Sequence, residues 1–101
     1  MSTAGAAAAT GDGDIMMHFL PSYAAVLHMQ QGHDPDTACR LALQPIVAYF
    51  PSFSGGLICV NMKGEYGGAS HKMRFTYSVR SDLTGGVLVI SPTDISVEMV
   101  T

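Results

Sequence analysis

The stretch GAAAATGDGDIMMHFL, residues 5–20, decides how the chain begins to fold. Its four alanines allow close packing against neighbouring elements, and Gly11 and Gly13 allow backbone angles and approaches that a side chain would block. A hydroxyl on Thr10 and two carboxylates, the first on Asp12, then stand at the expected start of a helix. Unpaired N–H groups at that end of a helix can meet the negative charge of a ligand. We therefore expect a site here, or half of one; the alternative is a glycine-rich turn with an Asp or Thr helix cap.

Two helical segments are expected next. Within residues 14–31, apolar side chains recur at spacings of three and four and form one face of a helix, and Pro21 must kink or restart it. That face consists of Met16, Phe19, Leu20, Tyr23 and Leu27. Gly32 ends this segment, and Asp34 as cap with Pro35 at the first position begins a second helix that runs to about residue 49. Its expected inner face consists of Ala38, Leu41, Ala42 and Tyr49, and Pro45 inside the segment argues against this helix.

The periodicity then changes to that of strands. Residues 57–62 place apolar groups on both faces, as in a sheet that is covered on each side. Lys63 and Gly64 form a turn, so residues 65–70 are expected to return antiparallel as a hairpin. Further strands are expected at residues 73–79, 87–90 and 95–100. The order predicts an α+β fold with two helices followed by antiparallel strands.

The composition limits the classes of partner. A chain of 101 residues that is 48% hydrophobic and 13% charged is about one small domain with a modest core. Its net charge of -3, with five basic residues that do not cluster, disfavours nucleic acid and acidic membranes as partners. No apolar run approaches the roughly twenty residues of a membrane helix, and the N-terminus lacks the features of a secretion signal. We expect no nucleic-acid and no membrane partner.

Eight motifs follow one another with almost no gaps: residues 5–14, 19–23, 32–35, 38–39, 50–51, 56–59 and 64–67, and Lys72. In order and spacing they closely resemble the C-terminal half of the glycosylasparaginases, or aspartylglucosaminidases, within the β subunit of these enzymes. The resemblance fades after about residue 77. It implies that residues 1–101 are a single incomplete domain, the C-terminal part of a glycosylasparaginase-like domain, with residues 80–101 as a divergent tail.

The resemblance implies a fold and an activity. The family's fold is the αββα sandwich of the N-terminal nucleophile hydrolases, of which this chain would be a part. Family members hydrolyse the amide between N-acetylglucosamine and the side chain of asparagine during glycoprotein degradation. Their precursor cuts itself and exposes a threonine whose hydroxyl attacks the amide while its own freed amine takes the proton. No cofactor is implied.

The resemblance also assigns roles to four residues. The residues that match Thr10 and Gly11 stabilise the oxyanion of the tetrahedral intermediate through a hydroxyl and a backbone N–H. Asp12 and Gly13 continue the loop that contacts the substrate. The family's nucleophile, and the arginine and aspartate that bind the substrate's α-carboxylate and α-amine, match no residue among the nine before Thr10. The chain alone is therefore expected to be inactive.

Cys39 and Cys59 match a pair that forms a disulfide in animal members of the family. The alternative is two buried free thiols. A disulfide would join the second helix to the first strand of the hairpin. By closing the loop between them it would stabilise the folded chain by roughly 3 kcal/mol. Ser70 stands where the family has another cysteine, and the cysteine that would pair with it is missing from the tail. The resemblance therefore implies no second bridge.

The four histidines are expected to be surface or hydrogen-bonded side chains rather than metal ligands. They are His18, His28, His33 and His71. His28 and His33 are five residues apart, which places them on different faces of a helix. Asp12 and Asp14 lack the further acids of a calcium loop. We expect no metal site.

Three functions remain open. The first is the C-terminal segment of a glycosylasparaginase, lysosomal if a full-length form exists, which contributes the oxyanion loop and has glycosylasparagine as substrate. Its partners would be the remainder of the enzyme, namely the α subunit and the N-terminal part of the β subunit, and it could form a homo-oligomer. The second is an inactive truncated fragment that acts only by association through open strand edges. The third is the related asparaginase and isoaspartyl peptidase branch, with smaller substrates.

Overall fold

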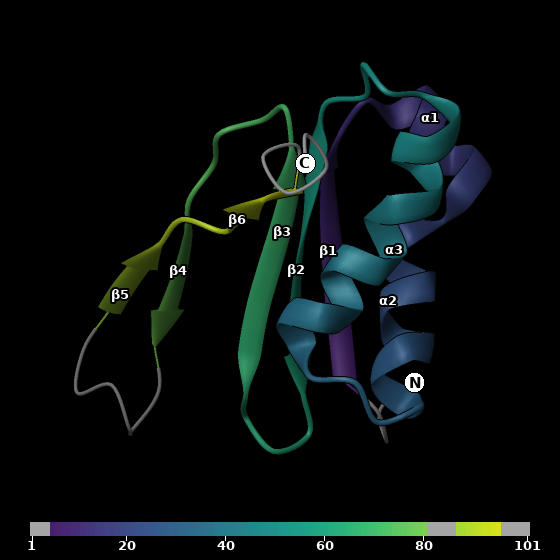
Figure 1. Cartoon of the computed structure of the whole chain (residues 1–101). Coiled ribbons are helices and arrows are strands. Elements are labelled where there is room, and N and C mark those ends of the chain that lie inside the picture. Colours follow the sequence, from purple (N-terminus) through teal and green to yellow (C-terminus); the bar gives the residue numbers. More distant parts are fainter. Residues whose placement is uncertain (1–4, 81–86, 96–101) are drawn as a thin grey trace.

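The computed structural model describes residues 5–80 and 87–95, and within these residues a strand is followed by three helices and five further strands. In order they are β1 (Gly5–Gly11), α1 (Gly13–Phe19), α2 (Pro21–Gln30), α3 (Pro35–Tyr49), β2 (Gly55–Asn61), β3 (Tyr66–His71), β4 (Tyr77–Arg80), β5 (Val87–Ile90) and β6 (Thr93–Asp94). The α+β prediction is confirmed, but a strand precedes the helices (Figure 1).

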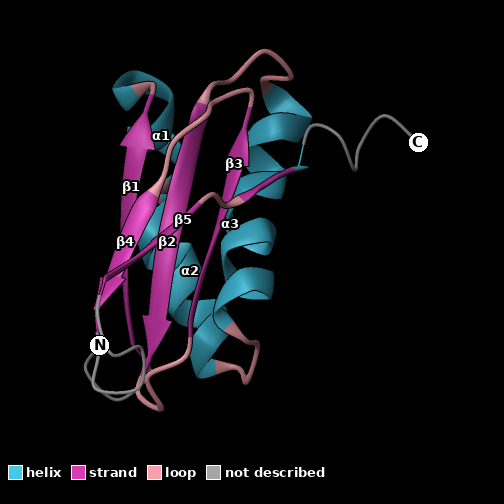
Figure 2. Ribbon diagram, turned by 90° about the vertical axis from the view of Figure 1, so that its left-hand side faces the viewer, coloured by secondary structure: helices cyan, strands magenta, loops and turns pink. Residues whose placement is uncertain are grey.

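The elements form three layers. The main sheet has the strand order β1-β2-β3-β6, in which β1, β2 and β3 are antiparallel neighbours and β6 pairs parallel with β3. The helices lie behind this sheet, and the antiparallel pair β4–β5 lies in front of it (Figure 2). The sheet is therefore covered by helices on one face and by a small strand pair on the other.

Strand β1 is an element that the sequence pattern did not predict. All seven of its residues pair with β2, from Gly5 opposite Asn61 to Gly11 opposite Gly55. A run of alanines neither alternates in polarity nor favours strands, so its conformation comes from pairing with an apolar neighbour rather than from its own propensity. The strand lies at one edge of the main sheet.

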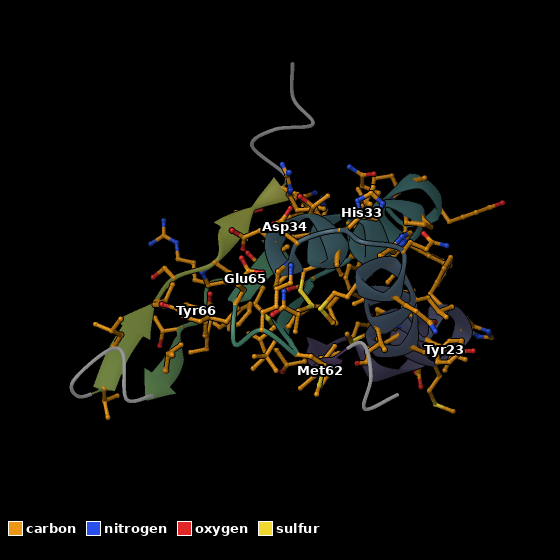
Figure 3. The ribbon with its side chains drawn as sticks, turned by 90° about the horizontal axis from the view of Figure 1, so that it is seen from below. Tyr23, His33, Asp34, Met62, Glu65 and Tyr66 are labelled. Atoms are coloured by element: carbon orange, nitrogen blue, oxygen red, sulfur yellow. A yellow bond between two sulfur atoms is a disulfide. The ribbon has the colours of Figure 1, made fainter. Side chains whose placement is uncertain are left out.

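The first helical segment is two helices, because Pro21 restarts the helix. Leu20 between them adopts a left-handed conformation with φ 47°, which ends α1. Met16 is buried as predicted, but Leu20 and Tyr23 are 60% and 58% exposed (Figure 3 shows Tyr23 at the periphery). Helix α2 instead buries Pro21, Ala25 and Met29. The predicted face was wrong there because one helical period does not continue through a left-handed residue.

Helix α3 has the predicted bounds and cap. The Asp34 carboxylate accepts hydrogen bonds from the Thr37 N–H at 3.2 Å and the Thr37 hydroxyl at 2.6 Å. The buried face consists of Pro35, Ala38, Cys39, Ala42, Leu43, Ile46 and Val47. Burial is thus confirmed for Ala38 and Ala42 and wrong for Tyr49, which is 77% exposed in the last turn. Pro45 lies within the helix, so the expectation that it argues against a helix here was wrong.

The predicted hairpin joins β2 to β3. Gly64 has φ 84° at the turn, and the Asn61 side chain accepts hydrogen bonds from the N–H groups of Lys63 and Glu65, both at 3.0 Å. Leu57 and Cys59 are buried against the helices, whereas Val60 on the opposite face is 42% exposed. The expectation of a strand covered on both sides is thus only partly met.

Two aromatic rings flank the start of β2. A side chain at Gly55 would meet the ring of Phe53, and one at Gly56 would meet the ring of Phe75. Because neighbouring residues of a strand point to opposite faces, the rings lie on opposite sides of the sheet. Phe53 is buried, and both glycines are required for this packing.

The predicted C-terminal strands are shorter than expected or not described. Burial alternates over residues 73–79 as predicted, but only Tyr77–Arg80 is a strand. The strand at Val87–Ile90 is confirmed. Of the candidate at 95–100, Ile95 is buried and residues 96–100 lie outside the described residues.

Candidate functional site

Thr10 and Gly11 lie at the end of edge strand β1, next to the start of β2. Thr10 is opposite Gly56, and both residues line a hollow of about 170 Å³ together with Phe75 and Thr76. Thr10 is exposed. It pairs with Gly56, whose added Cβ would meet Phe75, so the Thr10 side chain lies on the sheet face that carries Phe75 and β4. Thr10 therefore borders this hollow.

Asp12 and Gly13 follow directly and connect β1 to α1. Asp12 occupies the N-cap position of α1, but its side chain makes no capping hydrogen bond. Its backbone N–H donates to the Ser54 carbonyl at 3.1 Å, and its carbonyl accepts from the Met16 N–H at 3.0 Å. The Asp12 carboxylate therefore does not cap α1.

The backbone N–H of Gly11 is directed away from β2. The amides of an antiparallel strand point alternately toward and away from the neighbouring strand, and the N–H of Asp12 points toward β2, where it bonds Ser54. The N–H of Gly11 therefore points to the opposite side, at the edge where no further strand pairs in the described part of the chain. A hydroxyl and an outward N–H from successive residues are the two donor types that an oxyanion site uses.

The fold brings four further polar residues to this end of the sheet. They are Ser54, His71, Lys72 and Asp94. The Ser54 hydroxyl donates to the Lys72 carbonyl at 2.9 Å, and the Lys72 N–H donates to the Asp94 carboxylate at 3.4 Å. The sequence pattern predicted no role for Ser54 or Asp94. Their contacts join residues 18 and 22 positions apart, so no local pattern could have indicated them.

Cys39 and Cys59 form a disulfide, as predicted. It joins α3 to β2 across a sequence separation of 20, with the two Cα atoms 6.5 Å apart. Both cysteines are buried between the helices and the sheet. The alternative of two free thiols is therefore not what the structure shows.

The histidines differ in their surroundings. His71 is buried and its Nδ1 lies 2.6 Å from the Phe53 carbonyl oxygen, so it is a hydrogen-bonded core residue. The rings of His28 and His33 meet edge to face with centroids 5.8 Å apart, which corrects the expectation that they lie on different faces. The helix ends before His33, and the turn at Gly32 brings the second ring back to the first.

Within residues 5–80 and 87–95, no three side chains of His, Cys, Asp or Glu gather as ligands for a metal ion. The helices in the same ranges include none with the length and hydropathy of a membrane span.

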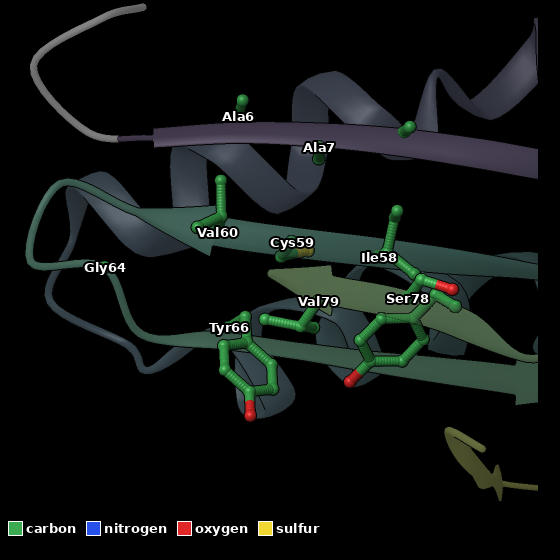
Figure 4. Close-up of a pocket in the computed structure, with 11 residues that line it drawn as sticks. Ala6, Ala7, Ile58, Cys59, Val60, Gly64, Tyr66, Ser78 and Val79 are labelled. Atoms are coloured by element: carbon green, nitrogen blue, oxygen red, sulfur yellow. The ribbon is translucent and has the colours of Figure 1, made fainter. Parts of the chain in front are cut away.

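A larger groove lies between the main sheet and β4. It has a volume of about 470 Å³, and Ile58, Val60, Tyr66 and Val79 surround it (Figure 4). The rings of Tyr66 and Tyr77 meet at its border with centroids 6.4 Å apart. Burial, then the Asp36 carboxylate and Tyr66, raise the pKa of the Tyr77 hydroxyl, which stays a neutral hydrogen-bonding group. The groove is mainly apolar and does not include Thr10.

Comparison with known proteins gives one family. A family model described as Asparaginase matches residues 1–87. The N(4)-(beta-N-acetylglucosaminyl)-L-asparaginases of Mus musculus and Rattus norvegicus are 44% and 46% identical to the chain over 98 and 84 residues. These matches cover 97% and 79% of the chain but 28% and 24% of the relatives. A probable isoaspartyl peptidase/L-asparaginase 3 of Arabidopsis thaliana is 43% identical over 77 residues, 76% of the chain and 21% of the relative. The chain thus spans about a quarter of the length of these relatives.

Proposed function

The chain belongs to the asparaginase family, and from this premise we propose that it is the C-terminal segment of an amidohydrolase that cleaves the bond between N-acetylglucosamine and asparagine. The names of the mouse and rat relatives support this substrate. We propose that the segment contributes the oxyanion and substrate loop, with Thr10 and Gly11 as donors and Asp12 and Gly13 as its continuation.

The observation that carries the proposal is the position of Thr10 and Gly11. Thr10 borders a hollow, and strand alternation directs the Gly11 N–H outward from the same strand end. When a nucleophile attacks an amide, the carbonyl oxygen takes on negative charge, and one preorganised donor at that oxygen is worth roughly 3 kcal/mol of barrier. The two donors belong to adjacent residues of a paired strand, so little reorganisation is needed to present both.

The nucleophile would come from outside this chain. We propose an N-terminal threonine, exposed by autocatalytic cleavage, that approaches from the remainder of the enzyme together with the groups that bind the substrate's α-amine and α-carboxylate. The open edge of β1 and the partly covered sheet face support such an association. The complete assembly would be the four-layer αββα sandwich and would act in lysosomal glycoprotein degradation.

Activity of the chain alone and of an assembled enzyme tests the proposal. The 101-residue chain is incubated with glycosylasparagine, alone and after co-expression with the part of the mouse relative that precedes the matched region, and aspartate release is measured. No turnover is expected from the chain alone. Turnover is expected from the assembly, and T10V should lower kcat by about 100-fold because it removes one donor. Thr76 lines the same hollow, so T76V is the matched control and should retain activity.

The asparaginase and isoaspartyl peptidase branch is a second candidate. The chain is 43% identical to the plant relative, which supports this branch, and 44% identical to the mouse relative, which supports the glycosylasparaginase branch. Assaying the assembly with glycosylasparagine, asparagine and an isoaspartyl dipeptide separates the two. Preference for either small substrate over glycosylasparagine would assign the chain to the second branch.

A further inference from the structure

Residues 53–54 lie between the end of β3 and the end of β1 and are hydrogen-bonded to both. On one side, His71 Nδ1 bonds the Phe53 carbonyl at 2.6 Å, and the Ser54 hydroxyl donates to the Lys72 carbonyl at 2.9 Å. On the other side, the Ser54 carbonyl accepts from the Asp12 N–H at 3.1 Å. These bonds connect the last residues of β3 to the loop that follows Gly11.

The His71 bond has a defined donor. A carbonyl oxygen only accepts, so Nδ1 must carry the proton, and the neutral ring is the Nδ1–H tautomer. His71 is 3% exposed and Phe53 is 1% exposed. A hydrogen bond between groups that are both removed from water restricts the backbone at residue 53 more than an exposed bond would.

The candidate loop lies directly against this segment. A Cβ atom at Gly11 would come within 2.5 Å of both the Ser54 carbonyl oxygen and the Gly55 Cα. There is no space between the two backbones, so a shift of residues 53–54 moves the peptide that joins Gly11 to Asp12.

The geometry points to His71 and Ser54 as positioning residues for the candidate loop at Gly11 and Asp12. They hold residues 53–54 in place, and these residues hold the peptide that joins Gly11 to Asp12 through the Asp12 bond. This inference rests on the proposed function for its catalytic meaning, but the mechanical coupling is a property of the chain alone.

Amide hydrogen exchange in the 101-residue chain tests the coupling. H71L removes the Nδ1 donor, and H71N restores one, because the amide nitrogen of Asn is bonded to Cγ as Nδ1 is in His. S54A removes the hydroxyl bond, and S52A is its control at a nearby exposed serine. The Asp12 amide should exchange about tenfold faster in H71L and S54A, relative to Leu43 in the core, and should recover in H71N.

Three results would overturn the inference: an unchanged Asp12 rate, acceleration of Asp12 and Leu43 by equal factors, or failure of H71N to restore protection. If H71L does not fold, the Asp12 exchange rates of S54A and S52A are compared instead, and equal rates would overturn the inference. In the assembled enzyme, H71L should lower kcat about tenfold with KM unchanged, and H71N should recover it. An assembly whose unsubstituted form is inactive contradicts the proposed function, while the exchange result still decides the coupling.

Discussion

The Asp36 carboxylate accepts a hydrogen bond of 2.9 Å from the N–H of Gly68 and so joins the first turn of α3 to β3 across 32 positions of sequence. This approach is possible because Gly67 has no side chain. A Cβ atom there would come within 2.6 Å of the Asp36 N atom and would overlap the carboxylate. The position of the longest helix on the sheet therefore depends on one glycine.

Gly67→Ala should destabilise the chain. The added methyl group would separate α3 from β3, and such overpacking costs about 2 kcal/mol. Gly13→Ala is the matched control, because no atom lies within 4 Å of the added Cβ and Gly13 begins a helix, where Ala is favoured. Urea unfolding of both variants measures the difference; equal free energies of unfolding would show that Gly67 does not limit this contact.

Asp34 should make stability depend on pH in acid. The Thr37 hydroxyl and then the Thr37 N–H lower the pKa of the Asp34 carboxyl from its ordinary value of 3.8. Because the folded pKa is the lower one, this contribution is complete above pH 3.8 and is lost as the pH falls through the folded pKa. The carboxylate is solvated, so the effect is about 0.5 kcal/mol or less. Unfolding between pH 5 and about 2 should show a smaller decline for D34N than for the unsubstituted chain, and a decline of equal size would contradict the assignment.

Leu20→Asn should stabilise the chain. Leu20 has φ 47° and is 60% exposed, so it carries the strain of a left-handed residue and gains little from burial. Asn tolerates this conformation better, and the gain should be up to about 1 kcal/mol. Met17 is 74% exposed in the adjacent helix with an ordinary φ, so Met17→Asn should show no gain. A lower melting temperature for Leu20→Asn would mean that its side chain contributes more than the strain costs.

Reduction of the Cys39–Cys59 bridge should lower the free energy of unfolding by roughly 3 kcal/mol. The double variant C39A/C59A should show a similar loss under non-reducing conditions. Alkylation followed by mass measurement checks the bridge directly. Two alkylated cysteines in a native, non-reduced preparation would show that the disulfide is absent.

Ala8 and Ala9 should respond oppositely to proline. With the Asp12 N–H toward β2, strand alternation directs the Ala8 N–H toward β2 and the Ala9 N–H to the open edge. Ala8→Pro should therefore destabilise the chain by about 3 kcal/mol, whereas Ala9→Pro should be tolerated, as proline is at sheet edges. If the remainder of the enzyme pairs with β1, Ala9→Pro should nevertheless abolish co-purification with it. Retained co-purification would place that association elsewhere.

Local signals predicted the parts of the fold that local contacts determine. Asp34 and Pro35 begin α3 and the helix ends at Tyr49 as expected, because the cap acts within one helical turn. The turn at Gly64 was predicted for the same reason. Of the candidate site, the local pattern indicated a site at Thr10 to Gly13, but the individual roles of these residues came only from the family resemblance and stay predictions.

Features that depend on distant contacts could not be read from the sequence. The alanines of β1 have no strand pattern and are extended because Leu57 and Ile58 lie opposite. The outward position of Tyr23 follows from the left-handed turn at Leu20, three residues earlier. The bond from His71 to Phe53 spans 18 residues and has no periodic signature.

The two rings on either side of Gly55 and Gly56 restrict how this protein can diverge. Any side chain at Gly55 would displace Phe53, and any at Gly56 would displace Phe75. Replacement of either glycine during evolution must therefore be preceded by replacement of the neighbouring aromatic residue with a smaller one. Among homologous sequences, each glycine and its ring should covary as a unit, and the two pairs should do so independently because the sheet separates them.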